Sequence, residues 1–519
     1  MNSIWLSENK QNNQYNQLAE DKTTDVCIIG AGIFGITCGY YLAKAGLKVT
    51  IIEKDEIGSK ATGHTTAKIT SQHGLFYTYL YETYGEKLAK DYLNANQEAI
   101  ENIKQIIEKE KINCDFETQS SFVYTTEKSE VNKIKREVDI LNSLGFPANF
   151  ATKIGLPFET EGSVQFKNQA QFNPIKYING LAKIITKNNG QIYTNTTAND
   201  VKQDEESFYT LTERGTIKSK YVIIATHYPI INFPGIYFLK MYQSTSYVIG
   251  VDPKKTLSNG MYISATQPTF SFRTANYNGR KILLLGGESH KTGTESTYEN
   301  TYGKLENYAK QLYPNCEILF RWDTRDCITL DKIPYIGKFS STMENIYVGT
   351  GFNKWGMTTS NVAANIICDM ILGKQNKYAY VFNSTRIKPI KNRTEVKNMI
   401  TESINSLAIK KLKDSNITFE EIPNNSGGII DINNQKVGIY KDTTRKHLCS
   451  KTNLHTFRMF AFMERYRQNM GLSMPWFKIR LYGEKSLWSS SKKPRNFQYF
   501  LKIFWIYYWL ICVVLLQSL

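Results

Sequence analysis

The chain has 519 residues, of which 41% are hydrophobic and 21% are charged, and it carries a formal net charge of +17. This length and balance are typical of a globular protein of several domains, and they exclude a disordered chain, a collagen and a transporter with many membrane spans. The charge is uneven, because residues 441–519 hold 14 of the 64 basic residues but only 3 of the 47 acidic ones. The rest of the chain is nearly neutral, so we predict no nucleic-acid partner.

The eight cysteines are scattered along the chain, and no two of them form a C-x-x-C pair. This pattern is typical of reduced thiols and offers no metal-binding knuckle, so we predict no metal site in the chain as written. Residues 1–24 lack the apolar stretch of a secretory signal and are predicted to form a polar surface arm. Together these features predict a cytoplasmic protein.

The first element of the folded body is a dinucleotide-binding motif. A short apolar strand over 25–29 leads into Gly30-x-Gly32-x-x-Gly35, then a helical pattern, and then a second strand over 49–52 that is followed by Glu53. In such a βαβ unit the glycines allow a tight turn, a close approach to a pyrophosphate and helix–strand packing, while the acid accepts hydrogen bonds from a ribose. The complete unit predicts a bound dinucleotide.

Segments that follow this unit favour FAD over NAD. A Gly/Thr-rich loop over 57–68 can reach the pyrophosphate and the flavin ring through backbone N–H and hydroxyl groups. An apolar strand over 221–226 ends in small residues, and residues 346–358 are predicted to form a strand, a Gly-rich turn and a helix start that can polarise a flavin. The residues predicted to contact FAD are Gly30, Gly32, Ile33, Phe34, Gly35, Glu53, Lys54, Thr62, Thr65, Thr66, Ala67, Val201, Ala225, Thr226, Gly351, Lys354, Gly356, Met357 and Thr358.

Hydrophobic periodicity predicts further elements along the chain. Helices are expected over 80–111 and 361–372, and a basic, helix-prone connector over 385–414. Residues 417–441 have the alternating, turn-punctuated pattern of a small β module. Strands are expected over 191–209, 215–225, 244–252, 281–286 and 345–348.

Three motifs carry a resemblance to a known family over Ile4–Lys374. They are Trp5-Leu6, the stretch A-T-G-H-T-T-A-K-I-T-S-Q-H-G over Ala61–Gly74, and Asp331-x-x-Pro334-x-Ile336-Gly337 before the last predicted flavin strand. Together with the segments above, they resemble the FAD-dependent amine and amino-acid oxidoreductases of the D-amino-acid oxidase, glycine oxidase and sarcosine oxidase superfamily. The second motif is similar to a bacterial subgroup whose members usually end in a Rieske [2Fe–2S] domain.

The resemblance implies an α/β fold, with an FAD-binding, Rossmann-like domain of the GR2 type and an interleaved substrate domain built on a mixed β-sheet. Family members oxidise a C–N bond by hydride transfer to flavin N5, which implies a small-molecule amine or amino acid as substrate. The implied FAD-binding segments are 25–95, 150–230 and 321–375, and the implied substrate-domain segments are 96–149 and 231–320.

Two positions depart from the family pattern. Counting back from Asp331 places Thr324 where sarcosine-oxidase-like members attach the flavin to a cysteine, and Cys327 misses that position. Non-covalent FAD is therefore expected. Thr358 stands where some members bind a substrate carboxylate with a lysine, which argues against a simple amino-acid substrate.

Four residues are candidates for catalysis, and each has a structural alternative. Arg273 could clamp a substrate anion or form a surface ion pair. His290 could orient the substrate or be a satisfied loop histidine. His64 and Lys68 lie in the predicted flavin loop, where a cation would stabilise reduced flavin, or they could serve in packing and hydrogen bonding.

The C-terminal part departs most from the family. After a linker over 376–415, residues 416–442 resemble the first strands of a Rieske domain, but the two Cys and two His ligands of a [2Fe–2S] cluster do not follow. Back-translation of Leu454–Phe460 and Gly471–Lys478, read one nucleotide later, allows C-T-H-L-G-C and D-C-P-C-H-G-S, the two ligand loops of such a domain. A frameshift near Thr443 or Thr444 is therefore our hypothesis for residues 443–519. The cluster is expected in intact relatives, where it would accept the electrons.

Residues 503–516 form an uncharged, aromatic and β-branched run. One interpretation is a C-terminal membrane anchor, although 14 residues fall short of the ~20 that a spanning helix needs. The other is out-of-frame translation of an AT-rich gene. If the run is real, the alternative function is a membrane-anchored flavoprotein with a structural or interaction role. The electron acceptor is left open by the chain as written.

Overall fold

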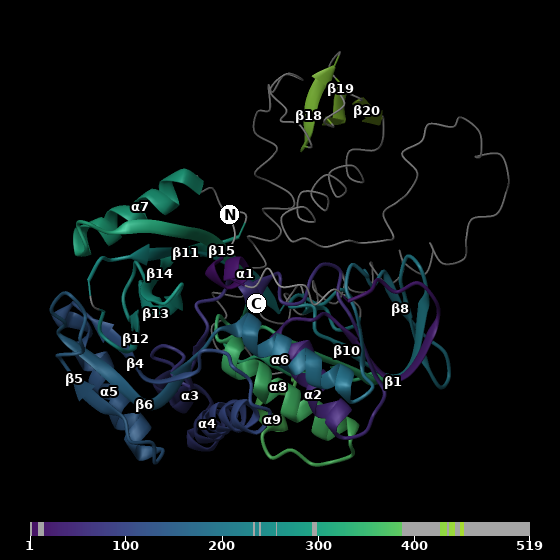
Figure 1. Ribbon diagram of the computed structural model, residues 1–519, viewed down its shortest axis with the longest axis horizontal. Coiled ribbons are helices and arrows are strands. Elements are labelled where there is room, and N and C mark those ends of the chain that lie inside the picture. The colour runs from purple at the N-terminus through teal and green to yellow at the C-terminus, as the bar shows by residue number, and fades with distance from the viewer. Residues whose placement is uncertain are drawn as a thin grey trace, which may run out of the picture.

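The computed structural model arranges the chain in two large β-sheets with helices packed against them (Figure 1). Segments of the two sheets alternate along the chain, so each sheet is assembled from several separated stretches. This interleaving confirms the expected α/β fold with a second, mixed sheet. The structure describes residues 3–8, 15–231, 234–237, 240–255, 257–292, 298–386, 426–432, 435–441 and 447–450.

The first sheet contains the dinucleotide-binding motif. Its central strand β1 (Lys22–Ile29) runs parallel to β2 (Val49–Ile52) on one side and to β10 (Thr216–Ile224) on the other. The C-terminal halves of these strands are apolar and buried, as expected for parallel strands that are covered on both faces. The sheet is completed by β7 (Gln191–Tyr193), β8 (Asp200–Gln203), β9 (Phe208–Leu211), β16 (Tyr335–Ser340) and β17 (Met343–Thr350).

Three helices pack side by side against this sheet, namely α2 (Ile33–Lys44), α6 (Pro174–Lys187) and α8 (Gly356–Ile371) (Figure 1). α2 is buried on nearly every side because α6 and α8 flank it. α6 starts sharply, since Asn173 accepts hydrogen bonds from the backbone of the first turn and Pro174 takes the first helical position. This packing fixes the N-termini of α2 and α8 at the same edge of the sheet.

The second sheet has nine strands in the order β15, β11, β14, β13, β12, β4, β6 and β3, with β5 paired to β6. It is mixed because β12 runs parallel to β4 but antiparallel to β13. α7 (Tyr298–Leu312) lies across β11 and β14 (Figure 1). The strands are β3 (Lys68–Ile69), β4 (Glu117–Thr125), β5 (Asn149–Ala151), β6 (Gly162–Gln171), β11 (Met241–Asp252), β12 (Met261–Ser264), β13 (Ser271–Tyr277), β14 (Arg280–Lys291) and β15 (Glu317–Thr329).

Sheet membership moves two of the predicted domain boundaries. The FAD-binding segments 150–230 and 321–375 each begin too early, because β6 pairs along its length with β4, and β15 pairs with β11. Alternating polar and apolar residues indicate a strand but do not say which sheet it joins, so the sequence could not place these two. The remaining helices are α1 (Ile4–Glu8), η1 (Ala61–His64), α3 (Tyr77–Tyr84), α4 (Glu86–Lys109), η2 (Lys128–Glu130), α5 (Val131–Ser143) and α9 (Ala379–Phe382).

Beyond residue 425 the described residues form a small antiparallel sheet of β18 (Ser426–Ile432), β19 (Gln435–Lys441) and β20 (His447–Ser450). The first two strands coincide with the predicted β module, whereas β20 falls within the segment that we interpret as out of frame. Residues 387–425, the two latent Rieske loops and the 503–516 run lie outside the described residues. Of the helices in the described part of the chain, none combines the length and apolar character that crossing a membrane requires.

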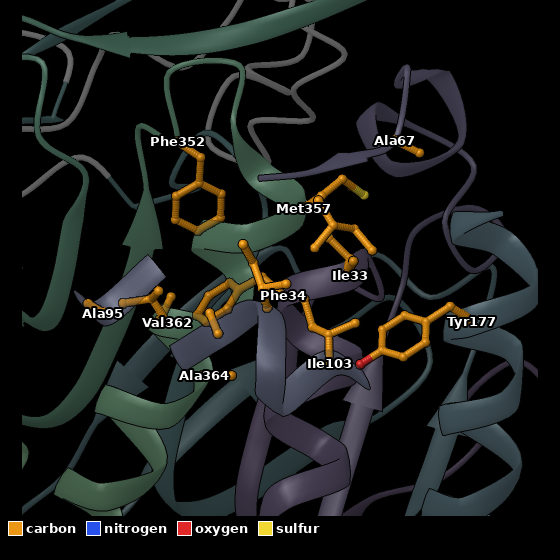
Figure 2. Packing of buried hydrophobic residues seen from close by; sticks show 14 of the residues in the cluster. Ile33, Phe34, Ala67, Ala95, Ile103, Tyr177, Phe352, Met357, Val362 and Ala364 are labelled. Atoms are coloured by element: carbon orange, nitrogen blue, oxygen red, sulfur yellow. The ribbon is translucent and has the colours of Figure 1, made fainter. Parts of the chain in front are cut away.

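A continuous apolar core lies beneath the N-termini of α2 and α8 (Figure 2). Ile33 and Phe34 open α2, while Phe352 and Met357 flank the start of α8. The rings of Phe34 and Phe352 meet edge to face, with their centroids 5.9 Å apart. This contact holds the two helix starts in a fixed relation to each other.

Candidate active site

A cavity of about 730 Å³ runs along the C-terminal ends of β1, β2 and β10 and continues beneath the second sheet. Its size suits a cofactor together with a small molecule, since such sites measure roughly 300–1,000 Å³. We call the part lined by residues within 29–34, 52–54, 196–198 and 225–226 the dinucleotide end. We call the part lined by residues within 243–248, 286–289 and 323–327 the substrate wall.

The dinucleotide end is built where backbone approaches backbone. A Cβ atom on Gly30, which has φ +110°, would lie 2.5 Å from the carbonyl oxygen of Ala225. A Cβ atom on Gly35 would lie 2.0 Å from the carbonyl oxygen of Gly30. Gly32 precedes α2 and offers the helix no side-chain cap. The result is an open cradle at a helix N-terminus, which fits a pyrophosphate in shape and in charge.

Glu53 follows β2 at the edge of this cradle. Its carboxylate accepts hydrogen bonds from the backbone N–H groups of Ala31, at 2.8 Å, and Asp55, at 3.0 Å. Burial raises the pKa of Glu53, although these backbone donors act in the opposite direction. Each carboxylate oxygen retains a lone pair, so the group can still accept from the hydroxyls of a ribose.

The 57–68 loop is fixed by side chains from outside it. Five successive carbonyl oxygens, from Gly63 to Ala67, each accept a side-chain hydrogen bond, and Ala67 adopts a left-handed backbone with φ +54°. A non-glycine residue holds this conformation only when its surroundings determine it. Ser3 donates to the carbonyl oxygen of Gly63, Trp322 to that of His64, and Trp5 to that of Thr65. Arg273 donates to the carbonyl oxygens of both Thr66 and Ala67.

Arg273 does not act as either of its predicted interpretations requires. Its side chain is buried, is absent from the cavity lining, and donates to the carbonyl oxygens of Thr66 and Ala67 at 2.8 and 2.7 Å. It also donates to the carbonyl oxygens of Phe172 and Thr274. Burial lowers the pKa of Arg273 to about 9. The residue is therefore an internal brace for the loop, and the sequence could not reveal this because three of the four carbonyls that it bonds lie about 100 or 200 positions away along the chain.

Lys68 lies at the end of the loop and lines the cavity. Its ammonium group is buried and donates to the carbonyl oxygen of Tyr262 at 2.8 Å and to the hydroxyl of Ser271 at 2.5 Å. Burial lowers the pKa of Lys68 to about 7, and the positive charge of Arg273 adds to the effect. The group can therefore exchange a proton near neutral pH.

The two candidate histidines have different surroundings. His64 lines the cavity, and its Nδ1 lies 2.8 Å from the carbonyl oxygen of Lys60. His290 is absent from the cavity lining and stacks on Tyr247 with ring centroids 5.7 Å apart, while its neighbour Ser289 reaches the cavity. This arrangement corresponds to the structural alternative for His290.

The predicted FAD contacts fall into two groups. Five of them do not line the cavity, for physical reasons that differ. Gly35 packs against the backbone of Gly30, and Gly351 packs against the side chain of Thr329. Ala67 is turned into the core, and Thr358 exchanges hydrogen bonds with the backbone of Thr70. Val201 packs against an apolar cluster, and Ala198 lines the cavity in its place. The lining residues are Gly30, Gly32, Ile33, Phe34, Glu53, Lys54, Thr62, Thr65, Thr66, Ala225, Thr226, Lys354, Gly356 and Met357.

Several polar residues of the cavity were not predicted. His227 follows the Ala225-Thr226 strand end with φ +65°, and Asp326 and Cys327 belong to β15. Burial alone would lower the pKa of His227, but Cys327 and Asp326 raise it to about 9. One sequence signal was available for the first of these, since a histidine stands directly after the small residues of a strand end. No signal marked the other two, because only pairing with β11 brings them to the cavity.

Comparisons with known proteins agree with this geometry. The profile of the family described as "FAD dependent oxidoreductase" matches residues 25–370. The chain is 36% identical over 439 residues to the "Putative Rieske 2Fe-2S iron-sulfur protein YhfW" of Bacillus subtilis, covering 84% of this chain and 86% of that protein. It is 22% identical to the gamma-glutamylputrescine oxidoreductase of Escherichia coli, covering 70% and 87%. The fold is similar to that of glycine oxidase from Geobacillus kaustophilus, with a TM-score of 0.61 and 20% identity over 71% of this chain and 100% of the other.

Proposed function

Because the chain belongs to the family of FAD dependent oxidoreductases, we propose that it oxidises a C–N bond of an amine or amino acid by hydride transfer to FAD. The observation that carries the proposal is one continuous cavity, in which a glycine-lined cradle for a dinucleotide leads directly to a polar wall from a second sheet. The gamma-glutamylputrescine oxidoreductase and glycine oxidase among the relatives act on nitrogen compounds by name, which supports this class of substrate.

Bound FAD would supply the hydride acceptor. Residues 30–34 would hold its pyrophosphate and Glu53 its ribose, while the braced 57–68 loop and the first turn of α8 would hold the flavin. With threonine at position 324, we propose that the attachment is non-covalent. Lys354 precedes α8, lines the cavity and donates to the hydroxyl of Ser246 at 2.7 Å, so it would place a positive charge near the cofactor.

Lys68 would accept a proton from the substrate. Hydride leaves the carbon beside a neutral amine, so the substrate ammonium must lose a proton before oxidation. Burial lowers the pKa of Lys68 to about 7, which allows Nζ to be neutral at a working pH near neutrality. The hydrogen bonds to Tyr262 and Ser271 hold this nitrogen at the cavity wall.

The test is reduction of the bound flavin without oxygen. Protein purified with FAD should lose flavin absorbance when mixed anaerobically with an amine or amino acid, and an unchanged spectrum with a broad panel of such compounds would contradict the proposal. The reduction rate of the wild type should rise with pH through about 7. In K68M the reduction rate should no longer rise with pH through about 7. In K167M, which changes an exposed lysine of β6, the rate should rise with pH as in the wild type.

We further infer that a Rieske cluster accepts the electrons in intact relatives. The name of the Bacillus subtilis relative and the β18–β19 hairpin at the predicted position support this inference. The gene should be resequenced between the codons of Gly438 and Trp488. A missing or extra base that brings both latent ligand loops into frame is the expected result, and a confirmed reading frame would rule the cluster out for this chain.

A further inference from the structure

The substrate wall contains a glycine that the backbone does not require. Gly286 lies within β14 and lines the cavity, and its φ is not positive. Apart from its neighbours along the chain, the atoms nearest to a Cβ atom there would be the carbonyl oxygen of Tyr247 and Cγ2 of Val248, both at 3.6 Å. Alanine would therefore fit in ordinary van der Waals contact, and it would also stabilise the strand, because glycine loses more conformational freedom on folding.

Gly287, the next residue, has a packing reason to be glycine. A Cβ atom on Gly287 would lie 3.0 Å from Cδ1 of Phe270 and 3.1 Å from Cδ2 of Leu305. Leu305 belongs to α7, so the missing side chain lets this helix approach β14. Among the described residues no such neighbour accounts for Gly286, which projects from the other face of the strand. A glycine inside a strand often marks a place where a ligand approaches closely.

Strand register places Gly286 in the middle of a row of side chains. It pairs with Val248 of β11 on one side and with Ser271 of β13 on the other, and Ile263 of β12 pairs in turn with Ser271. Residues paired across strands project from the same face of a sheet, and all four of these line the cavity. Because glycine has no side chain, the row is interrupted between Val248 and Ser271. We call this gap the Gly286 notch.

The face that carries the notch is turned toward the 57–68 loop. Trp322 of β15 extends the same row and donates to the carbonyl oxygen of His64 in that loop. At the other side of the notch, Ser271 accepts a hydrogen bond from Nζ of Lys68, at the end of the loop. The notch therefore lies beside the group that we propose accepts the proton of the substrate.

The surroundings of the notch suit an alkyl chain. Val248 and Ile263 are apolar, Gly286 presents only its Cα atom, and the hydroxyl of Ser271 is already bonded to Lys68. A substrate whose nitrogen lies at Lys68 would extend its chain along this row. We propose, on the basis of the function proposed above, that the Gly286 notch holds the alkyl chain of the amine substrate, so that Gly286 determines which chain lengths the enzyme binds well.

Primary amines of increasing length test the notch, namely methylamine, ethylamine, butylamine and hexylamine. Binding to the FAD-loaded protein is measured directly after anaerobic mixing from the perturbation of the flavin spectrum, and reduction from the later loss of flavin absorbance. In the wild type the affinity should rise from methylamine to butylamine by about three- to fourfold for each methylene that is buried.

G286A fills the notch with one methyl group and should fold with at least the thermal stability of the wild type. It should weaken butylamine binding by at least about tenfold and change methylamine binding by less than about twofold, because methylamine is too short to occupy the notch. G303A is the matched control, since it adds a methyl group in α7 that meets nothing within 4 Å. It should keep the chain-length series of the wild type.

Val248 provides the second test, because its Cγ2 atom is among the nearest to the new Cβ atom. In the double variant V248A/G286A this methyl group is removed, so butylamine affinity should return to within about threefold of the wild type. A general distortion of the strand would not be repaired in this way. If G286A is obtained without FAD, V248A alone widens the notch from its other side and should favour 2-methylbutylamine over butylamine relative to the wild type.

The outcomes separate this proposal from the function on which it rests. A wild type whose affinity does not change with chain length, or a G286A variant that weakens methylamine and butylamine equally, overturns the notch. If the chain-length series depends on Gly286 but no amine reduces the flavin, the notch stands and the proposed oxidation fails for these amines. If all the amines reduce the flavin and G286A changes neither their affinities nor their rates, the proposed oxidation stands and the notch is wrong.

Discussion

The two ends of the cavity are built from different parts of the polypeptide. At the dinucleotide end, Gly30 and Gly35 bring backbone against backbone, and the atoms that face the cofactor are largely N–H groups and one acid. At the substrate wall, the lining includes polar side chains of two neighbouring strands, such as Thr324 and Asp326 of β15 and Gln243 of β11. The first end depends on backbone shape, whereas the second depends on the choice of side chain.

This difference shows which part of the site can change its specificity during evolution. A cradle made of backbone tolerates almost no substitution, because any Cβ atom would displace the chain itself. A wall of strand side chains can change its chemistry one residue at a time without disturbing the sheet, so substrate choice can change while the cofactor site stays the same. The predictions below challenge this contrast, beginning with the change of largest expected effect.

Replacing Gly35 by alanine should abolish FAD binding. The new Cβ atom would lie 2.0 Å from the carbonyl oxygen of Gly30, so the turn or α2 must move by more than the close-packed core allows. We expect affinity for FAD to fall by at least about 100-fold, which corresponds to roughly 2.7 kcal/mol. The measurement is flavin content after purification, followed by titration with added FAD.

Gly303 provides the control for this substitution. It lies in α7, and a Cβ atom there would meet nothing within 4 Å. G303A should bind FAD like the wild type and gain up to about 1 kcal/mol of stability from its higher helix propensity. A G35A protein that retains normal flavin content would show that the cradle is less rigid than the backbone contacts indicate.

Replacing Arg273 by glutamine should loosen the 57–68 loop. The guanidinium holds the carbonyl oxygens of Thr66 and Ala67 and two further carbonyls, and glutamine cannot reach all of them. Leaving buried carbonyls without donors should lower the free energy of unfolding by about 3 kcal/mol. Thermal unfolding with and without added FAD measures this loss. If R273Q instead unfolds normally and loses only substrate affinity, Arg273 is a substrate clamp after all.

The contrast between the two ends also explains what the sequence could predict. The βαβ unit was found from glycine spacing, and β2 was placed correctly over 49–52, because backbone constraints leave a mark at fixed intervals along the chain. Val201 was predicted to contact the cofactor, but it packs against an apolar cluster, and Ala198, which precedes β8, lines the cavity instead. A single strand position has no comparable spacing rule.

The substrate wall was largely invisible in the sequence. β15 was not predicted, and β11 was predicted three residues short at its start, so the pairing that brings Asp326 to the cavity could not be foreseen. Arg273 was predicted either to clamp a substrate anion or to form a surface ion pair, because an arginine in a polar strand has the same pattern whether it faces a ligand, the solvent or the interior. Long-range register, rather than local propensity, decides between these two positions.

His73 should make the floor of the cavity sensitive to acid. Its ring stacks on Trp355, which lines the cavity, with centroids 5.0 Å apart. Nε2 donates to the carbonyl oxygen of Thr70 at 3.0 Å, so Nδ1 accepts from the hydroxyl of Tyr92 at 2.7 Å and the ring is neutral. Burial lowers the pKa of His73 to about 3, below the value of about 6.5 in the unfolded chain.

The sign of this effect follows from proton binding. Between those two pKa values the unfolded chain binds the proton and the folded protein does not, so stability falls as the pH falls below about 6.5. The contribution of His73 between pH 6.5 and 5 is about 1.5 kcal/mol. The free energy of unfolding is measured by denaturant titration at pH 6.5 and at pH 5. The loss of stability between these two pH values should be about 1.5 kcal/mol smaller in H73Q than in the wild type. An equal change in both proteins would contradict the buried, neutral state.

The smallest effect is expected at Thr358, which stands where a substrate-binding lysine was considered. Its hydroxyl donates to the carbonyl oxygen of Thr70 and accepts from the N–H of the same residue, both at 2.9 Å, and it does not line the cavity. T358V keeps the shape of the side chain but leaves the buried N–H of Thr70 without an acceptor, whereas the carbonyl oxygen of Thr70 keeps its donor in His73, so the substitution should cost about 1 kcal/mol of stability. T358S retains the hydroxyl and should lose less. Because Thr358 ties α8 to the backbone just after β3 rather than to a substrate, T358V should leave the affinity of the FAD-loaded protein for its amine substrates unchanged, and a change in that affinity would place the start of α8 in the substrate wall.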